Sequence, residues 1–202
     1  MTLTSWLSLV AICILGALSP GPSLAVVLKQ SMNNDASHGM VAGISHALGV
    51  ALWALLTIFG LGVLVSESPL TFSILTYAGA AYLAWMGIQA LRAGSSHIKP
   101  LTNGRSAYLD AARDGLMISL LNPKLAIFFL ALFSQFISTD HTAADQLVMV
   151  STVALIDAGW YVLVALVLSR MGLLEVLSRH SQRINQITGV IFIALAVRVV
   201  TL

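Results

Sequence analysis

Long apolar stretches fill most of this chain, and short polar segments separate them. Charged residues are absent or single in six of these stretches, namely residues 1–28, 39–66, 68–91, 115–139, 146–169 and 184–202. A helix that crosses the hydrocarbon core of a bilayer needs about 20 mostly apolar residues, and each stretch supplies roughly that length or more. The pattern predicts an all-α integral membrane protein with six transmembrane helices.

Prolines interrupt the first and the fourth stretch at corresponding positions, and we expect both helices to be broken there. When Pro22 is aligned with Pro123, Leu24 falls on Leu125. Proline removes a backbone hydrogen bond, and in lipid each unsatisfied backbone group costs several kcal/mol, so the freed groups must face protein, water or a ligand. Breaks at corresponding positions of two repeats are typical of a transporter whose substrate site lies near the middle of the membrane.

The chain divides into two repeats of three helices each. The third helices correspond as well, because residues 79–84 resemble residues 189–194. We predict a first repeat over residues 1–92, a cytoplasmic surface linker over 93–112 and a second repeat over 113–202. Since three is an odd number, the second repeat enters the membrane from the opposite side, which is the inverted-repeat arrangement of many secondary transporters.

The composition agrees with a membrane location and excludes several classes of protein. Of the 202 residues, 58% are hydrophobic and 9% are charged, and the mean hydropathy is +0.92. Almost nothing remains outside the six stretches, so we expect no enzyme, no cofactor and no nucleic-acid partner. The formal net charge of +2 is also too small to suggest binding to a polyanion.

The positions of Lys and Arg predict how the helices are oriented. Basic residues follow the first, third and fifth stretches, at Lys29, Arg92, Lys99, Arg105, Arg113, Arg170, Arg179 and Arg183. The connections around Glu67 and residues 140–145 contain no Lys or Arg. Under the positive-inside rule the basic loops are cytoplasmic, and both termini lie on the external or periplasmic side.

The first stretch could also be a signal peptide, because Ala17-Leu18-Ser19 resembles a cleavage site. Signal peptides begin with a basic region, however, and no Lys or Arg precedes this apolar run, so we expect it to be inserted uncleaved. Cys13 is the only cysteine. We expect it to be a small buried side chain and not part of a disulfide.

A broken helix exposes backbone groups that suit an amino-acid zwitterion. The half-helix after each break begins with free N–H groups and the positive end of a dipole, and the half before it ends with free carbonyls. A carboxylate would bind the N–H groups and an ammonium would bind the carbonyls. The predicted substrate-binding residues are Ser19, Pro20, Gly21, Pro22, Ser23, Asn122, Pro123 and Lys124. The alternative is that each proline only kinks its helix.

Lys124 and Asp157 place opposite charges near the middle of the fourth and fifth helices. A charge at that depth costs at least about 2.5–3.5 kcal/mol, so such residues are functional by default. We expect Lys124 to contact a substrate carboxylate and Asp157 to carry a proton or hold an ammonium. The alternative is that the two neutralise each other in a structural ion pair.

His46 in the second helix is the next candidate for proton coupling. A lone histidine in a membrane helix more commonly bonds a backbone carbonyl, and that alternative stays open. The His, Cys and carboxylate residues show no spacing typical of a metal site, so we expect no metal ligands.

Several motifs taken together resemble the LysE/RhtB family of amino-acid exporters. They are Ser19-Pro20-Gly21-Pro22, Gly79-x-x-Tyr82-Leu83-x-x-x-Gly87, Leu121-Asn122-Pro123-Lys124 and the segment at Gly189, in this order along nearly the whole chain. The resemblance implies a six-helix protein of the bacterial inner membrane that exports amino acids or related small metabolites by proton antiport. It also implies that the motif prolines and Lys124 lie near the pathway.

Two other functions remain open at this point. A transporter of a metal ion or other small ion would be expected to carry acidic or histidine-rich segments, which this chain lacks. A non-transporting assembly subunit would have no reason to keep Lys124 and Asp157 within the bilayer. The sequence does not fix the exported metabolite, the coupling stoichiometry or whether a homo-oligomer forms.

Overall fold

The computed structural model describes residues 1–19, 21–92, 107–136, 142–168 and 173–201, and within these ranges the chain forms eight α-helices and no strand. The helices are α1 (Leu3–Leu18), α2 (Pro22–Asn33), α3 (Ala36–Glu67), α4 (Pro69–Arg92), α5 (Tyr108–Leu120), α6 (Pro123–Phe133), α7 (Ala143–Leu168) and α8 (Leu173–Thr201). The all-α prediction is confirmed for the described residues.

Both predicted helix breaks are present. The axes of α1 and α2 are bent by 60° relative to each other, and those of α5 and α6 by 56°. Pro22 and Pro123 each occupy the first turn of the second half-helix. At that position no intrahelical N–H bond is lost, and the fixed φ of proline suits the helix that follows. Each proline therefore begins a new half-helix after the break.

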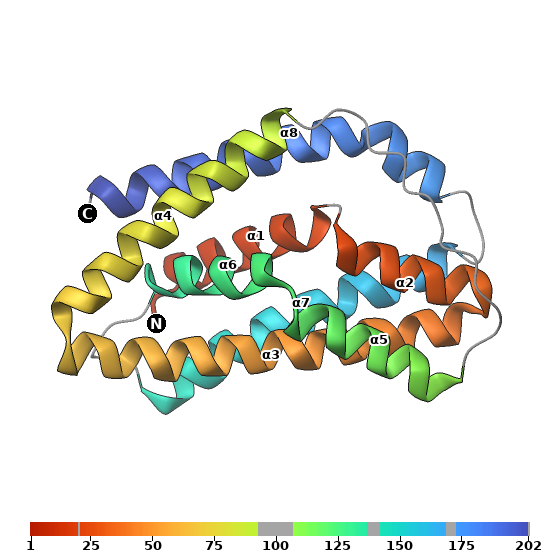
Figure 1. Cartoon of the computed structure of the whole chain (residues 1–202), viewed down its shortest axis with the longest axis horizontal. Coiled ribbons are helices and arrows are strands. Elements are labelled where there is room, and N and C mark those ends of the chain that lie inside the picture. The colour runs from red at the N-terminus through yellow and green to blue at the C-terminus, as the bar shows by residue number, and fades with distance from the viewer. Residues whose placement is uncertain (20, 93–106, 137–141, 169–172, 202) are drawn as a thin grey trace.

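The helices run back and forth along the long axis of the molecule (Figure 1). The α1–α2 pair runs in the opposite direction to the α5–α6 pair, and α1 begins at the same end of the molecule at which α8 ends. Helix α3 packs along α7 and helix α4 along α8, and each of these two pairs is antiparallel. The half-helices α1 and α6 lie between the two pairs, so both breaks fall in the middle of the molecule.

Four segments have the length and composition of membrane spans within the described part of the chain. Two are continuous, Ala36–Leu61 of α3 and Ala143–Val167 of α7, and the other two are the bent pairs α1–α2 and α5–α6, each taken as one broken span. Many large apolar side chains are exposed on the surface, as on a protein that faces lipid. The chain is therefore a multi-pass membrane protein, while the six-span arrangement stays a prediction.

Several helices extend further than the apolar pattern predicted. Lys29 lies in α2, Arg113 in α5, and Arg179 and Arg183 in α8, where loops were expected. Helix α5 begins at Tyr108, inside the predicted 93–112 linker, while residues 93–106 of that linker lie outside the described residues. The reason is that a helix satisfies its own backbone hydrogen bonds and continues beyond the apolar stretch into water. The first charged residue was therefore a poor marker of helix ends.

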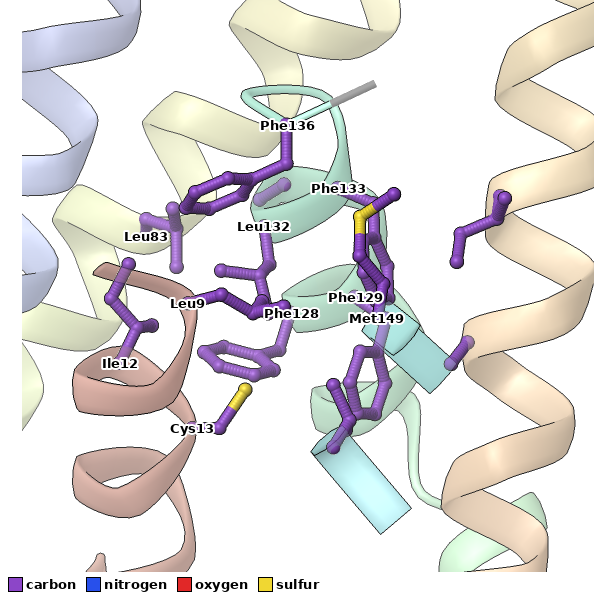
Figure 2. Close-up of a cluster of buried hydrophobic side chains, with 14 of the residues drawn as sticks. Leu9, Ile12, Cys13, Leu83, Phe128, Phe129, Leu132, Phe133, Phe136 and Met149 are labelled. Carbon is purple, nitrogen blue, oxygen red and sulfur yellow. The ribbon is translucent and has the colours of Figure 1, made fainter. Parts of the chain in front are cut away.

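Buried apolar side chains from α1, α4, α6 and α7 meet in one core. Figure 2 shows Leu9, Ile12 and Cys13 of α1 facing Phe128 and Leu132 of α6. The Cys13 thiol is free and 6% exposed, which confirms the predicted buried role. This core holds the first half of one broken helix against the second half of the other.

Candidate functional site

The two helix breaks open onto one shared cavity. The volume inside it is about 60 Å³, which is below the roughly 300–1,000 Å³ of most small-molecule sites. The sequence-predicted residues along its wall are Ser19, Gly21, Pro22, Ser23, His46, Asn122, Lys124 and Asp157. Pro20 and the side chain of Pro123 lie outside the described residues. Residues predicted from four separate segments of the chain are thus brought together in space.

The start of α2 presents backbone N–H groups that no side chain caps. Gly21 is the N-cap residue, its backbone is extended, and it has no side chain to accept a hydrogen bond from the first turn. Ala25 is the first residue of this helix to donate back to Gly21, through an N–O distance of 3.2 Å. Because the first N–H groups of a helix have no intrahelical acceptor, we expect that of Ser23, which lines the cavity, to be available to a ligand.

The start of α6 is partly capped, and the ammonium of Lys124 reaches from it to the break between α1 and α2. The Asn122 side chain accepts a hydrogen bond from the Lys124 backbone N–H at 3.0 Å. The Lys124 ammonium donates to the Ser19 hydroxyl at 3.5 Å, which links α6 to the end of α1. Lys124 is half-buried and forms no ion pair with a described carboxylate. Its charge is therefore available to a ligand in the cavity.

Asp157 pairs with His46 and not with Lys124. The Asp157 carboxylate lies 2.7 Å from Nδ1 of His46, and the two residues are 8% and 1% exposed. The alternative of a Lys124–Asp157 ion pair is wrong for this structure, as is that of a histidine bonded to a backbone carbonyl. Among the residues that the structure describes, Nε2 of His46 has no hydrogen-bond partner although it is buried, and His46 lines the cavity.

Tyr161 is a cavity residue that the sequence interpretation missed. Its ring packs edge-on against His46, with ring centroids 4.9 Å apart and planes at 70°, and it lines the cavity together with Ser23 of α2. Tyr161 lies one helical turn after Asp157 on α7, and residues four apart share a helix face. That spacing was the signal that could have found it.

The rest of the cavity wall is apolar, and it too was missed. Phe128 lies four residues after Lys124 on α6, and Gly16 lies three residues before Ser19 near the end of α1. Phe129, Phe192 and Met86 also belong to this part of the wall. The cavity therefore has a charged side at the helix breaks and an apolar side formed by aromatic rings.

A second charge pair lies outside the cavity wall. The Lys29 ammonium of α2 is 3.2 Å from the Asp114 carboxylate of α5, and the Gln30 amide donates to the same oxygen at 2.8 Å. The Lys29 and Asp114 side chains are 25% and 36% exposed. This pair gives matched controls for substitutions of the cavity charges. Among the described residues, no three His, Cys, Asp or Glu side chains are grouped as a metal site would require.

Comparison with known proteins identifies the family. A family model described as LysE type translocator matches residues 14–202. The chain belongs to this family of LysE type translocators. The resemblance found in the motifs is thereby confirmed, and a translocator is a transport protein, not an enzyme.

Relatives of this translocator include proteins named for amino-acid efflux. A threonine efflux protein of Salmonella typhimurium is 26% identical over 196 residues, which cover 93% of each chain. A homoserine/homoserine lactone efflux protein of the same organism is 34% identical over 163 residues, or 78% of this chain and 77% of the relative. A leucine efflux protein of an Enterobacter species is 31% identical over 147 residues, or 69% and 68%. No solved structure matches the chain.

Proposed function

We propose that this translocator is a secondary active exporter of amino acids or related small metabolites, driven by protons that move inward across the bacterial inner membrane. One observation carries the proposal: the ends of two proline-broken helices, Lys124 and the Asp157–His46 pair all line one cavity. The names of the relatives, which specify threonine, homoserine and leucine, point to the same class of substrate. These substrates share a carboxylate or its lactone and an ammonium.

The two charged parts of the cavity suit the two charges of an amino-acid zwitterion. The carboxylate would bind the free N–H groups at the start of α2 and the ammonium of Lys124, because anions are favoured at a helix N-terminus. The substrate ammonium would bind near Asp157, the carboxylate that lines the same cavity. Each charge of the substrate then meets an opposite charge away from water, where the interaction is stronger than in solvent.

The Asp157–His46 pair also provides a way to couple the substrate to a proton. With one proton on each nitrogen of His46, the pair is an imidazolium beside a carboxylate and carries no net charge. With one proton fewer, the pair carries a net charge of −1 and attracts the substrate ammonium. Substrate and proton would therefore compete for the same pair, so that binding of one releases the other. That exclusion is what antiport requires, and Nε2 of His46, which has no partner in the cavity, is the exchangeable site.

The repeat arrangement supports alternating access to this cavity. The α1–α2 and α5–α6 pairs run in opposite directions, and α3 and α4 pack against their counterparts α7 and α8. Two units related in this way can tilt against each other around a site that stays in place, and this opens the site first to one side and then to the other. We therefore also propose that the chain crosses the membrane six times, as two inverted repeats of three helices each.

The orientation in the membrane is tested with topology reporters. We expect reporters fused after Gly104 and after Arg179 to score cytoplasmic and one fused after Thr142 to score external, because the basic residues of the connections mark the cytoplasmic side. Helix α1 begins and α8 ends at one end of the molecule, which agrees with both termini on the external side. A cytoplasmic reporter at Thr142 would contradict the topology and the inverted pairing with it.

Export itself is tested in bacterial cells that either contain or lack the protein. Cells are loaded in turn with dipeptides that release threonine, homoserine, leucine or alanine, and intracellular and extracellular amino acids are then measured over time. We expect cells with the protein to hold less of at least one amino acid inside and to release more of it. Equal intracellular and extracellular levels in the two strains for every amino acid tried would contradict the proposal.

A further inference from the structure

We propose that Gly16 and Phe128 set the size limit of a subsite that takes an uncharged substrate side chain. This subsite deepens the proposed export function and rests on it. It is the apolar wall of the cavity formed by Gly16, Phe128, Phe129, Phe192 and Met86. The substrates are then neutral amino acids, and the contact between Gly16 and Phe128 decides how large their side chains can be.

The charged groups of the cavity wall already pair with the substrate carboxylate and ammonium, so none is left to pair with a charged substrate side chain. Lys124 is the counter-ion of the substrate carboxylate, and Asp157 with His46 is that of the substrate ammonium. A lysine or glutamate side chain would bring a further charge to a wall of aromatic and aliphatic groups. An unpaired charge in such surroundings is strongly disfavoured, so the cavity selects against it.

The position of Phe128 ties this wall to the charged end of the cavity. Phe128 lies one turn after Lys124 and on the same face of α6, so a substrate held at Lys124 extends its side chain toward the ring. Figure 2 shows the Phe128 ring between α6 and α1, next to Cys13. Gly16 lies one turn after Cys13 on the same face of α1, so Gly16 also faces the Phe128 ring.

The contact between Gly16 and the ring leaves no spare room. A Cβ atom added at Gly16 would lie 3.2 Å from Cζ of Phe128, closer than an ordinary van der Waals contact. The ring is itself packed, because its centroid lies 5.4 Å from that of Phe129 and 5.7 Å from that of Phe192. A methyl group at Gly16 would therefore take space beside the Phe128 ring in the cavity wall, and loss of the ring would enlarge the cavity there.

The test measures a ratio of substrates within each variant, so that differences in expression cancel. Uptake of leucine and of alanine into inverted membrane vesicles is compared for the wild-type protein, Gly16→Ala, Phe128→Ala and the double variant. We expect the leucine-to-alanine ratio to fall roughly tenfold in Gly16→Ala and to rise by a similar factor in Phe128→Ala, as for a change of a methylene or more in a hydrophobic pocket. The double variant should keep the raised ratio of Phe128→Ala, because the ring that the new methyl group meets is gone.

Matched controls use the same chemical changes away from the cavity. Gly60 has nothing within 4 Å of an added Cβ atom, and Phe59 is 61% exposed. Gly60→Ala and Phe59→Ala should therefore leave the ratio unchanged. Alanine is also the better helix former, so Gly16→Ala does not weaken α1 through its backbone.

Three outcomes separate this inference from the export function. If the wild-type protein takes up neither leucine nor alanine and no other amino acid, the export function is wrong. If it transports neutral amino acids but the ratio stays the same in Gly16→Ala and Phe128→Ala, the size limit is set elsewhere and this inference is wrong. Uptake of lysine or glutamate at a rate similar to leucine would also overturn it, while export of amino acids would stand.

Discussion

Replacing Asp157 by Asn should abolish accumulation of substrate driven by a proton gradient. Asn keeps the size of the side chain and can still hydrogen-bond to His46, which lies 2.7 Å away. It removes the negative charge, so the pair can no longer alternate between neutral and negative states as a proton leaves and returns. We expect the variant to bind substrate more weakly and to exchange it slowly across the membrane without accumulating it.

The measurement is uptake into inverted vesicles with and without an imposed proton gradient, followed by exchange of labelled for unlabelled substrate. Asp114→Asn is the matched control, because Asp114 is also an ion-paired carboxylate but lies outside the cavity wall. That control should still accumulate substrate. If Asp157→Asn accumulates substrate against its gradient as well as the wild-type protein does, Asp157 is a structural counter-ion and the proton travels elsewhere.

Replacing Lys124 by Met should weaken substrate binding and leave the proton site intact. The Met side chain has a similar length, but it cannot donate to a carboxylate or to Ser19, which Lys124 contacts at 3.5 Å. A hydrogen bond to a charged group contributes about 1.5–3 kcal/mol. We therefore expect the KM for an amino acid to rise roughly 10- to 100-fold.

This change is measured as the concentration dependence of uptake into vesicles at a fixed proton gradient. Lys29→Met is the matched control, since it removes an ammonium from the Lys29–Asp114 pair outside the cavity, and its KM should stay near the wild-type value. A Lys124→Met variant with an unchanged KM would show that the carboxylate binds elsewhere. A substrate with an esterified carboxylate has no negative charge for Lys124 to bind. For this substrate Lys124→Met should leave the KM unchanged, which gives a second check.

The sequence predicted the parts of the fold that depend on local chemistry. Both helix breaks were correct, because a proline cannot continue a preceding helix but fits the first turn of a new one, where Pro22 and Pro123 lie. The cavity residues at these breaks were also found, since corresponding positions of two repeats meet near the centre of such a fold. Helix ends were placed less well, since charged residues such as Arg183 continue α8 into the polar region.

The partners of the buried charges were not predicted, because they depend on how distant helices pack. His46 and Asp157 are 111 positions apart in sequence, and nothing in the local pattern of either helix indicates that α3 brings the histidine to α7. The apolar wall was missed for a different reason. Phe128 lies one turn from Lys124, so helical spacing could have placed it beside the cavity. In an apolar helix, however, an aromatic residue that lines a cavity looks the same in sequence as one that fills the core.

The central claim is that an outward movement of amino acid is exchanged for an inward movement of protons at this cavity. It is tested most directly with inverted vesicles whose lumen is acidified, using the wild-type protein and a neutral amino acid. We predict that substrate accumulates in the lumen, that its entry alkalinises the lumen, and that a protonophore abolishes both. Accumulation that persists with the protonophore, or substrate entry with no change in luminal pH, would contradict the claim.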